Sequence, residues 1–139
     1  MSASGEAPRR LDDVTLVATR QLYEADLPSL AAAGIRLIVN NRPDGEEPGQ
    51  PSSAEIEAAA RAAGLDYRHI PIAGGFPPDR IEAMAQALEQ GPLLAYCRSG
   101  TRSTFLWALA RAKLGAAAGD TVAAAAAAGY DLAPIRGWL

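Results

Sequence analysis

Short apolar runs alternate along the chain with segments whose apolar residues recur every three or four positions. Such runs predict buried β-strands, whereas the wider spacing predicts amphipathic helices. The expected strands lie at Val14 to Ala18, Ile35 to Val39, Tyr67 to Ile72 and Leu93 to Tyr96. The expected helices, with their caps, run from Asp26 to Gly34, Ser52 to Gly64, Asp79 to Gly91, Thr104 to Leu114 and Asp120 to Gly129.

This alternation of strand and helix is typical of α/β proteins with a mostly parallel sheet. We therefore expect a three-layer sandwich in which helices cover both faces of the sheet. The 139 residues suffice for one core of ordinary size, so we expect a single domain over residues 1–139, with residues 1–10 as a flexible tail. In such folds ligands bind at the carboxyl ends of the strands.

Polar residues next to the apolar segments predict where helices begin. Ser52 and Glu55 have the spacing of a capping box. Further side-chain caps are expected at Asp26, Asp120 and Asp131. The segment from Thr104 to Leu114 is apolar almost all round, which indicates a buried helix at the centre of the domain.

The loop between the last strand and this helix contains the only cysteine, Cys97. A strand that leads through a loop into a helix directs several backbone N–H groups to one point, where the helix dipole also favours negative charge. With the nearby guanidinium groups, these should make Cys97 a nucleophilic thiolate of depressed pKa. Arg102 can hold two oxygens of a tetrahedral anion in its planar fork. The other candidate anion-binding residues are Arg98, Ser99, Gly100, Thr101 and Ser103.

A lone cysteine is most often a small buried hydrophobic residue. The Arg, Ser and Gly neighbours of Cys97 suit an apolar core badly, which favours a nucleophile instead. A single cysteine excludes an internal disulfide and argues against a cysteine-rich metal site. We expect no metal and no organic cofactor.

The chain carries 13 Lys and Arg against 16 Asp and Glu, a formal net charge of −3. An acidic chain has no overall positive field for nucleic acid or an anionic membrane, so any attraction for anions is local to the loop. The first ten residues lack the apolar core of a signal peptide, and no run is long enough to span a bilayer. We expect a cytoplasmic protein that binds neither nucleic acid nor membrane.

The loop sequence CRSGTRS resembles the active-site loops of both cysteine phosphatases and rhodanese sulfurtransferases. The phosphatase signature has five residues between Cys and Arg, whereas bacterial rhodaneses commonly have four, as here between Cys97 and Arg102. Ser103 stands where a phosphatase has its arginine. A shorter loop presents fewer amides around a smaller space, which suits a single sulfur better than a phosphoryl group.

Four motifs together resemble one family. They are NNRPDGE at Asn40 to Glu46, QP at Gln50 and Pro51, YRHIPI at Tyr67 to Ile72, and YCRSGTRS at Tyr96 to Ser103. With them the chain, from about Leu11 to Arg136, resembles the bacterial beta-lactamase hydrolase-like family of phosphatase-like domains. The resemblance implies a dual-specificity-phosphatase-like fold, in line with the helical sequence after Leu114. Family members are described as phosphatases and as sulfurtransferases, some fused to a persulfide-oxidising metallo-hydrolase, which implies a persulfide-handling enzyme as a candidate partner.

A likeness to phosphatases also implies a general acid after the strand that ends at Ile72, but Ala73 stands there. Asp79 follows two prolines and fits the start of a helix better than catalysis. Asp44 and Glu46 are further candidates, although turn and salt-bridge roles suit them better.

Three more residues of these motifs carry polar groups. Arg42 either braces the acids of its loop or extends the anion site. His69, the only histidine, is expected to be a hydrogen-bonded core residue. Tyr96 replaces the histidine that precedes the cysteine in phosphatases.

From these observations we predict an enzyme that uses the Cys97 thiolate on a small sulfur- or phosphate-containing substrate. Sulfur transfer of the rhodanese type, through a persulfide, is the main hypothesis, because the group that a sulfur donor such as thiosulfate releases is a stable anion and needs little help from an acid. The alternative is hydrolysis of phosphomonoesters through a phosphocysteine. A second alternative is a non-catalytic module that senses anions or thiols.

Overall fold

The four apolar runs and the short segment Arg9–Arg10 pair into one five-stranded sheet in the computed structural model, which describes residues 7–139. The strands are β1 (Arg9–Arg10), β2 (Thr15–Val17), β3 (Leu37–Asn40), β4 (Asp66–His69) and β5 (Leu93–Tyr96). Their order is β1-β2-β5-β3-β4, parallel except for β1, which runs antiparallel at the edge. Every residue of β3 and β5 is buried, as expected of central strands covered on both faces.

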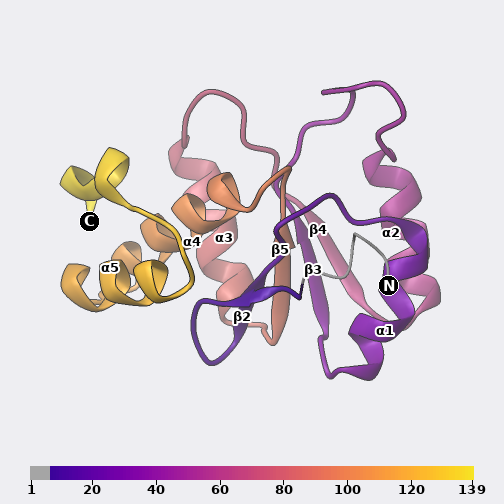
Figure 1. Ribbon diagram of the computed structural model, residues 1–139, viewed down its shortest axis with the longest axis horizontal. Coiled ribbons are helices and arrows are strands. Elements are labelled where there is room, and N and C mark those ends of the chain that lie inside the picture. Colours follow the sequence, from indigo (N-terminus) through magenta and orange to yellow (C-terminus); the bar gives the residue numbers. More distant parts are fainter. Residues whose placement is uncertain (1–6) are drawn as a thin grey trace.

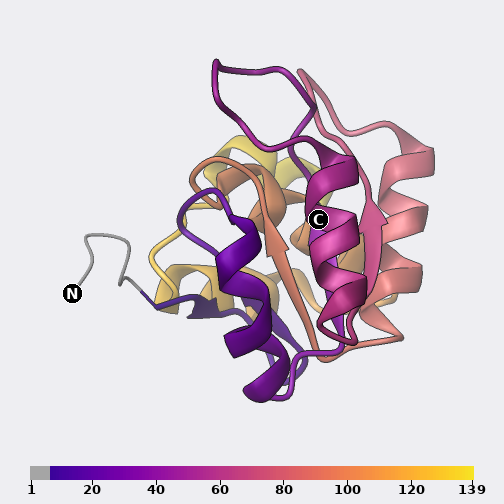
Figure 2. The ribbon, with the colours of Figure 1, turned by 90° about the vertical axis from the view of Figure 1, so that its right-hand side faces the viewer.

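Helices cover both faces of the sheet. They are α1 (Leu27–Ala32), α2 (Ser53–Ala62), α3 (Pro78–Leu88), α4 (Thr101–Lys113) and α5 (Ala118–Ala127), with 3-10 segments η1 (Glu24–Asp26) and η2 (Ala133–Trp138). Figure 1 shows α1 and α2 on one side of the sheet and α3, α4 and α5 on the other, and Figure 2 looks onto the α1 and α2 side. Buried apolar residues fill the space on each face. The predicted three-layer α/β sandwich with a mostly parallel sheet is confirmed.

The central buried helix is α4, as the sequence predicts, but it begins at Thr101 rather than at Thr104. Gly100 precedes it with a φ of +96°, a left-handed conformation that lets the loop turn directly into the helix. Arg102 and Ser103 therefore belong to the first helical turn. This early start places the helix N-terminus beside Cys97.

Of the predicted caps, the Ser52 and Glu55 capping box is present, and the Asp131 carboxylate accepts a hydrogen bond from the Ala133 N–H at 2.9 Å. Asp26 occupies the predicted N-cap position of α1, but its side chain makes no cap hydrogen bond to that helix; its carboxylate accepts from both terminal nitrogens of Arg20 at 2.9 Å and from the Tyr23 N–H at 2.7 Å. The predicted cap at Asp120 is wrong. Asp120 lies inside the first turn of α5, because that helix begins at Ala118.

The predicted flexible tail is partly wrong. Arg9 and Arg10 form β1 by pairing with Val17 and Leu16, and the Arg9 guanidinium donates to the Ala128 carbonyl at 2.9 Å. Residues 1–6 of that tail lie outside the described residues. Within residues 7–139, no helix combines the length and the apolar character that a membrane crossing requires.

Candidate active site

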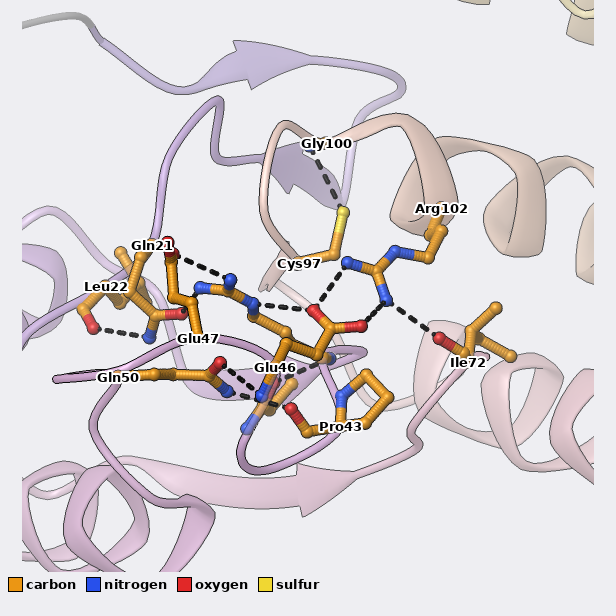
Figure 3. Close-up of polar contacts among 12 residues, drawn as sticks. Gln21, Leu22, Pro43, Glu46, Glu47, Gln50, Ile72, Cys97, Gly100 and Arg102 are labelled. Carbon is orange, nitrogen blue, oxygen red and sulfur yellow. Dashed lines mark hydrogen bonds and ion pairs between the residues drawn. The ribbon is translucent and has the colours of Figure 1, made fainter. Parts of the chain in front are cut away.

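The loop from Cys97 to Gly100 connects the end of β5 to the start of α4 and encloses the sulfur. Cys97 is only 1% exposed, and the Gly100 N–H donates to its Sγ at 3.2 Å (Figure 3). Burial by itself raises the pKa of the thiol, but hydrogen bonds from the backbone and from the Ser103 hydroxyl outweigh burial and lower the pKa. The backbone donors belong to Ser99, Gly100 and Ser103.

The sequence predicts that the helix N-terminus and the nearby guanidinium groups together produce the thiolate. The hydrogen bonds that lower the Cys97 pKa come from the loop and the first turn of α4. Arg98 is exposed, and its charge acts on Glu47, whose pKa is lowered by Arg42 first and by Arg98 to a lesser extent. The hydrogen bonds of the helix start therefore favour the thiolate most, and Arg102, whose pKa is raised in part by the Cys97 charge, favours it as well.

Ser103 connects this helix start to the loop after β3. It is completely buried, and its hydroxyl donates to Asn41 Oδ1 at 2.7 Å. Asn41 is fixed in turn, because its side-chain amide donates to the Ile70 carbonyl at 2.9 Å. A hydroxyl has one proton and a rotatable O–H bond, so Ser103 can turn its proton from Asn41 to the Cys97 thiolate.

Gly100 is the residue that the loop conformation requires. Besides its positive φ, a Cβ atom at this position would lie 2.9 Å from the Ala18 carbonyl oxygen and would collide with the hydroxyl of Tyr130. That hydroxyl donates to the Ser99 carbonyl at 3.0 Å, so Tyr130 braces the loop from outside. The sequence analysis missed Tyr130, since no local pattern connects it with residues thirty-one positions away.

Arg102 has a partner that the sequence does not predict. Its Nη1 and Nη2 atoms donate to the two carboxylate oxygens of Glu46 at 2.7 and 2.9 Å, and Nη1 also donates to the Ile72 carbonyl at 2.9 Å. Figure 3 shows the guanidinium between the Cys97 sulfur and Glu46. Glu46, together with the negative charge of Cys97, raises the pKa of Arg102. Within residues 7–139, the Nε–H of Arg102 donates to no protein atom.

Arg42 braces the acids of its own loop, one of the two roles that the sequence leaves open. The side chain is 1% exposed. Its Nε donates to Glu46, Nη2 to Glu47 and Nη1 to Gln21, each at 2.8 Å. The hydrogen bond from Arg102, followed by that from Arg42, lowers the pKa of Glu46 to about 2. Glu46 therefore remains ionised at neutral pH and cannot act as a general acid.

The other accessory candidates have structural partners. Asp44 Oδ1 accepts from the Ser53 N–H at 2.7 Å, at the start of α2. Asp79 lies in the first turn of α3, and its carboxylate pairs with Arg80 at 2.7 Å. His69 is exposed rather than part of the core, and its Nε2 lies 2.9 Å from the Arg42 carbonyl oxygen. These contacts match the turn, salt-bridge and helix-start roles better than proton transfer.

The Cys97 thiol should titrate below the ordinary cysteine pKa, and replacing Ser103 with alanine should raise that pKa. Ser99→Ala is the matched control, because the Ser99 hydroxyl contacts Thr101 Oγ1 at 3.3 Å instead of the sulfur. The ultraviolet absorbance of the thiolate against pH, with a Cys97→Ser variant subtracted to remove tyrosine ionisation, measures the pKa. A thiol that titrates at or above the ordinary value would contradict this geometry.

Comparison with known proteins places this site in a defined family. Residues 9–114 match the family described as the phosphatase-like domain of beta-lactamase hydrolase-like proteins. A beta-lactamase hydrolase-like protein of Agrobacterium fabrum is 47% identical over 94 residues, which cover 63% of this chain and 21% of that protein. A beta-lactamase hydrolase-like protein of Xylella fastidiosa is 41% identical over 115 residues, which cover 80% of this chain and 27% of that protein. The chain thus spans about a quarter of the length of these relatives.

Solved structures agree with this placement. A candidate phosphatase of Neisseria meningitidis has a TM-score of 0.78 at 35% identity, with 93% of each chain covered. PTPMT1 has a TM-score of 0.70 at 13% identity, with 95% and 93% covered, and supports the fold alone. These likenesses confirm the dual-specificity-phosphatase-like fold. Because the family match covers most of the chain, this protein belongs to the phosphatase-like domain family of beta-lactamase hydrolase-like proteins.

Proposed function

We propose that the chain is a cysteine-dependent phosphatase. The observation that carries this proposal is the position of the Cys97 sulfur at the start of α4, where the Gly100 N–H donates to it at 3.2 Å and the Ser99 and Ser103 backbone groups also lower its pKa. The thiolate attacks phosphorus, the bond between phosphorus and the ester oxygen breaks, and that oxygen leaves as an anion that takes a proton from water. Water then hydrolyses the phosphocysteine to inorganic phosphate and restores the thiol. The family and the fold favour this reaction over sulfur transfer, our main hypothesis from the sequence.

The acidic residues around the loop restrict the substrate. Glu46 is ionised, and Asp44 and Asp79 are held by structural partners. A positioned general acid typically contributes about 10²- to 10⁴-fold to the rate by protonating a leaving group. Without one, the enzyme should favour phosphoesters whose leaving oxygen is stable as an anion, such as aryl phosphates.

Sulfur transfer is the second candidate, and the same scarcity of acids favours it. The Cys97 thiolate would attack the outer sulfur of a donor such as thiosulfate, the sulfur–sulfur bond would break, and sulfite would leave as an anion. The product is a Cys97 persulfide, which a second thiophilic acceptor removes. The four-residue spacing from Cys97 to Arg102 also suits this reaction.

One experiment separates these reactions. The protein is incubated with an aryl phosphate, an alkyl phosphate or thiosulfate, and the Cys97 peptide is analysed by mass spectrometry while released phosphate is measured. We expect a phosphoryl group on Cys97 and phosphate release from the aryl ester, about 10²-fold or more faster than from the alkyl ester.

A sulfur atom on Cys97 after thiosulfate, with no turnover of either ester, would replace the phosphatase by the sulfurtransferase. Equal rates for the aryl and alkyl esters would show that an acid assists the leaving group after all. If Cys97 gains neither group, the anion- or thiol-sensing module becomes the function to pursue.

A further inference from the structure

A groove of about 960 Å³ adjoins the Cys97 loop on the face of α4 that looks away from the sheet. Successive turns of α4 form its floor through Phe105, Leu109 and Ala112. One wall comes from the loop after β4 and from α3, and the other from the C-terminal segment, drawn in yellow beside α4 in Figure 1. Those walls contain Ile72, Phe76, Ile81, Ile135, Trp138 and Leu139.

The groove and the anion loop share residues. Thr101 and Arg102 line the groove at the N-terminal end of α4, and Lys113 lines it at the other end. Because α4 has 13 residues, the groove extends for about 20 Å from the loop. Ile72 also connects the groove to the anion loop, since it lines the groove and its carbonyl accepts a hydrogen bond from Arg102 at 2.9 Å.

The charged side chains of the lining lie only at its ends, at Arg102 and at Lys113, whose ammonium pairs with Glu82 at 3.2 Å. Gly74 and Gly75 line one wall with their backbone, and the side chains around them are apolar. An extended peptide would find few hydrogen-bond partners here for its amide groups, whereas a hydrocarbon needs none. Trp138 stands at the edge with 71% of its surface exposed and can cover such a ligand.

We propose that this groove binds an elongated apolar part of the substrate whose phosphoryl group lies at the Cys97 loop. The inference rests on the proposed function for the identity of the head group, and on the groove for the rest of the molecule. The substrate class is a phosphate compound with a long apolar body that runs from Arg102 towards Lys113. Selection between substrates then depends on Phe105 and Trp138, which contact that body and not the phosphoryl group.

Calorimetric titration with methyl-, butyl- and decylphosphonate, below the concentrations at which they form micelles, tests this proposal without any turnover. Methylphosphonate reports the anion loop and the longer members report the groove. We expect the Kd to fall by up to about fourfold for each added methylene that the groove buries. Trp138→Ala should raise the Kd of decylphosphonate about five- to tenfold, as expected for the loss of ~50 Å² of apolar contact. The Kd of methylphosphonate should not change.

Leu114→Ala is the control, because Leu114 is also an exposed apolar residue, at 48%, but does not line the groove. It should leave every Kd unchanged. If methylphosphonate binds and the affinity does not rise with chain length, the proposed role of the groove is wrong, while the proposed phosphatase function stands. The proposed role of the groove is also wrong if affinity rises with chain length but neither Trp138→Ala nor Phe105→Ala reduces that rise. Binding of the long phosphonates alone would support the groove and contradict the anion loop, and binding of none would overturn both.

Discussion

Replacing Cys97 with serine should lower kcat/KM for an aryl phosphate by a factor of about 10⁴ to 10⁶, the loss typical of a removed nucleophile. The hydrogen bonds around position 97 lower the pKa of a thiol enough to favour its ionised form. A serine hydroxyl ionises far less readily, and no histidine lies in the loop to act as its base. Phosphate release at saturating and subsaturating substrate measures the effect.

The Cys97→Ser variant should still bind inorganic phosphate, because its backbone donors and Arg102 remain. Calorimetry on the variant and the wild type should give Kd values within about threefold of each other, and their thermal unfolding should coincide. A residual kcat/KM within tenfold of wild type, in a folded variant that binds phosphate, would assign the nucleophile to another group.

Replacing Arg102 with alanine should lower kcat/KM by about 10²- to 10³-fold, the usual cost of losing a charge-stabilising donor. Its guanidinium lies between the Cys97 sulfur and Glu46, which holds its two terminal nitrogens (Figure 3). The variant should also bind phosphate more weakly, and both measurements should change together. Arg102→Lys keeps the charge but loses the planar fork, and should recover only part of the activity.

Glu46→Gln separates substrate contact from orientation. This variant retains Arg102 but removes the carboxylate charge that holds its fork, so we expect a loss of about tenfold, smaller than that of Arg102→Ala. Thermal unfolding identifies any general destabilisation, since Arg42 is buried and also depends on Glu46. Full activity in Arg102→Ala would exclude the guanidinium from the reaction.

Local sequence determines much of this site. The apolar run of β5, the cysteine, the glycine and the buried helix α4 follow one another along the chain, so periodicity and residue type suffice to predict an anion-binding loop around Cys97. The same local signals predict the α/β alternation and the capping box at Ser52. They are less certain at helix starts, since Asp26 stands at the N-cap of α1 without a side-chain cap hydrogen bond and Asp120 lies inside the first turn of α5.

Contacts between distant residues depend on the order of the strands. Glu46 and Arg102 are fifty-six positions apart, and they meet because β3 and β5 are parallel neighbours whose carboxyl ends lie together. The sequence predicts that both loops lie at this edge of the sheet. It does not predict that the fork of Arg102 holds Glu46, because that pairing depends on the backbone position of each loop.

The position of the C-terminal segment is even less predictable from the sequence. Its sequence predicts a closing element with a cap at Asp131, and the structure contains that cap. Only the tertiary structure places Tyr130 against Ser99 and Trp138 along α4. Helical periodicity specifies which face of a segment is apolar, but the docking of that face depends on packing against the whole core, which no local pattern encodes.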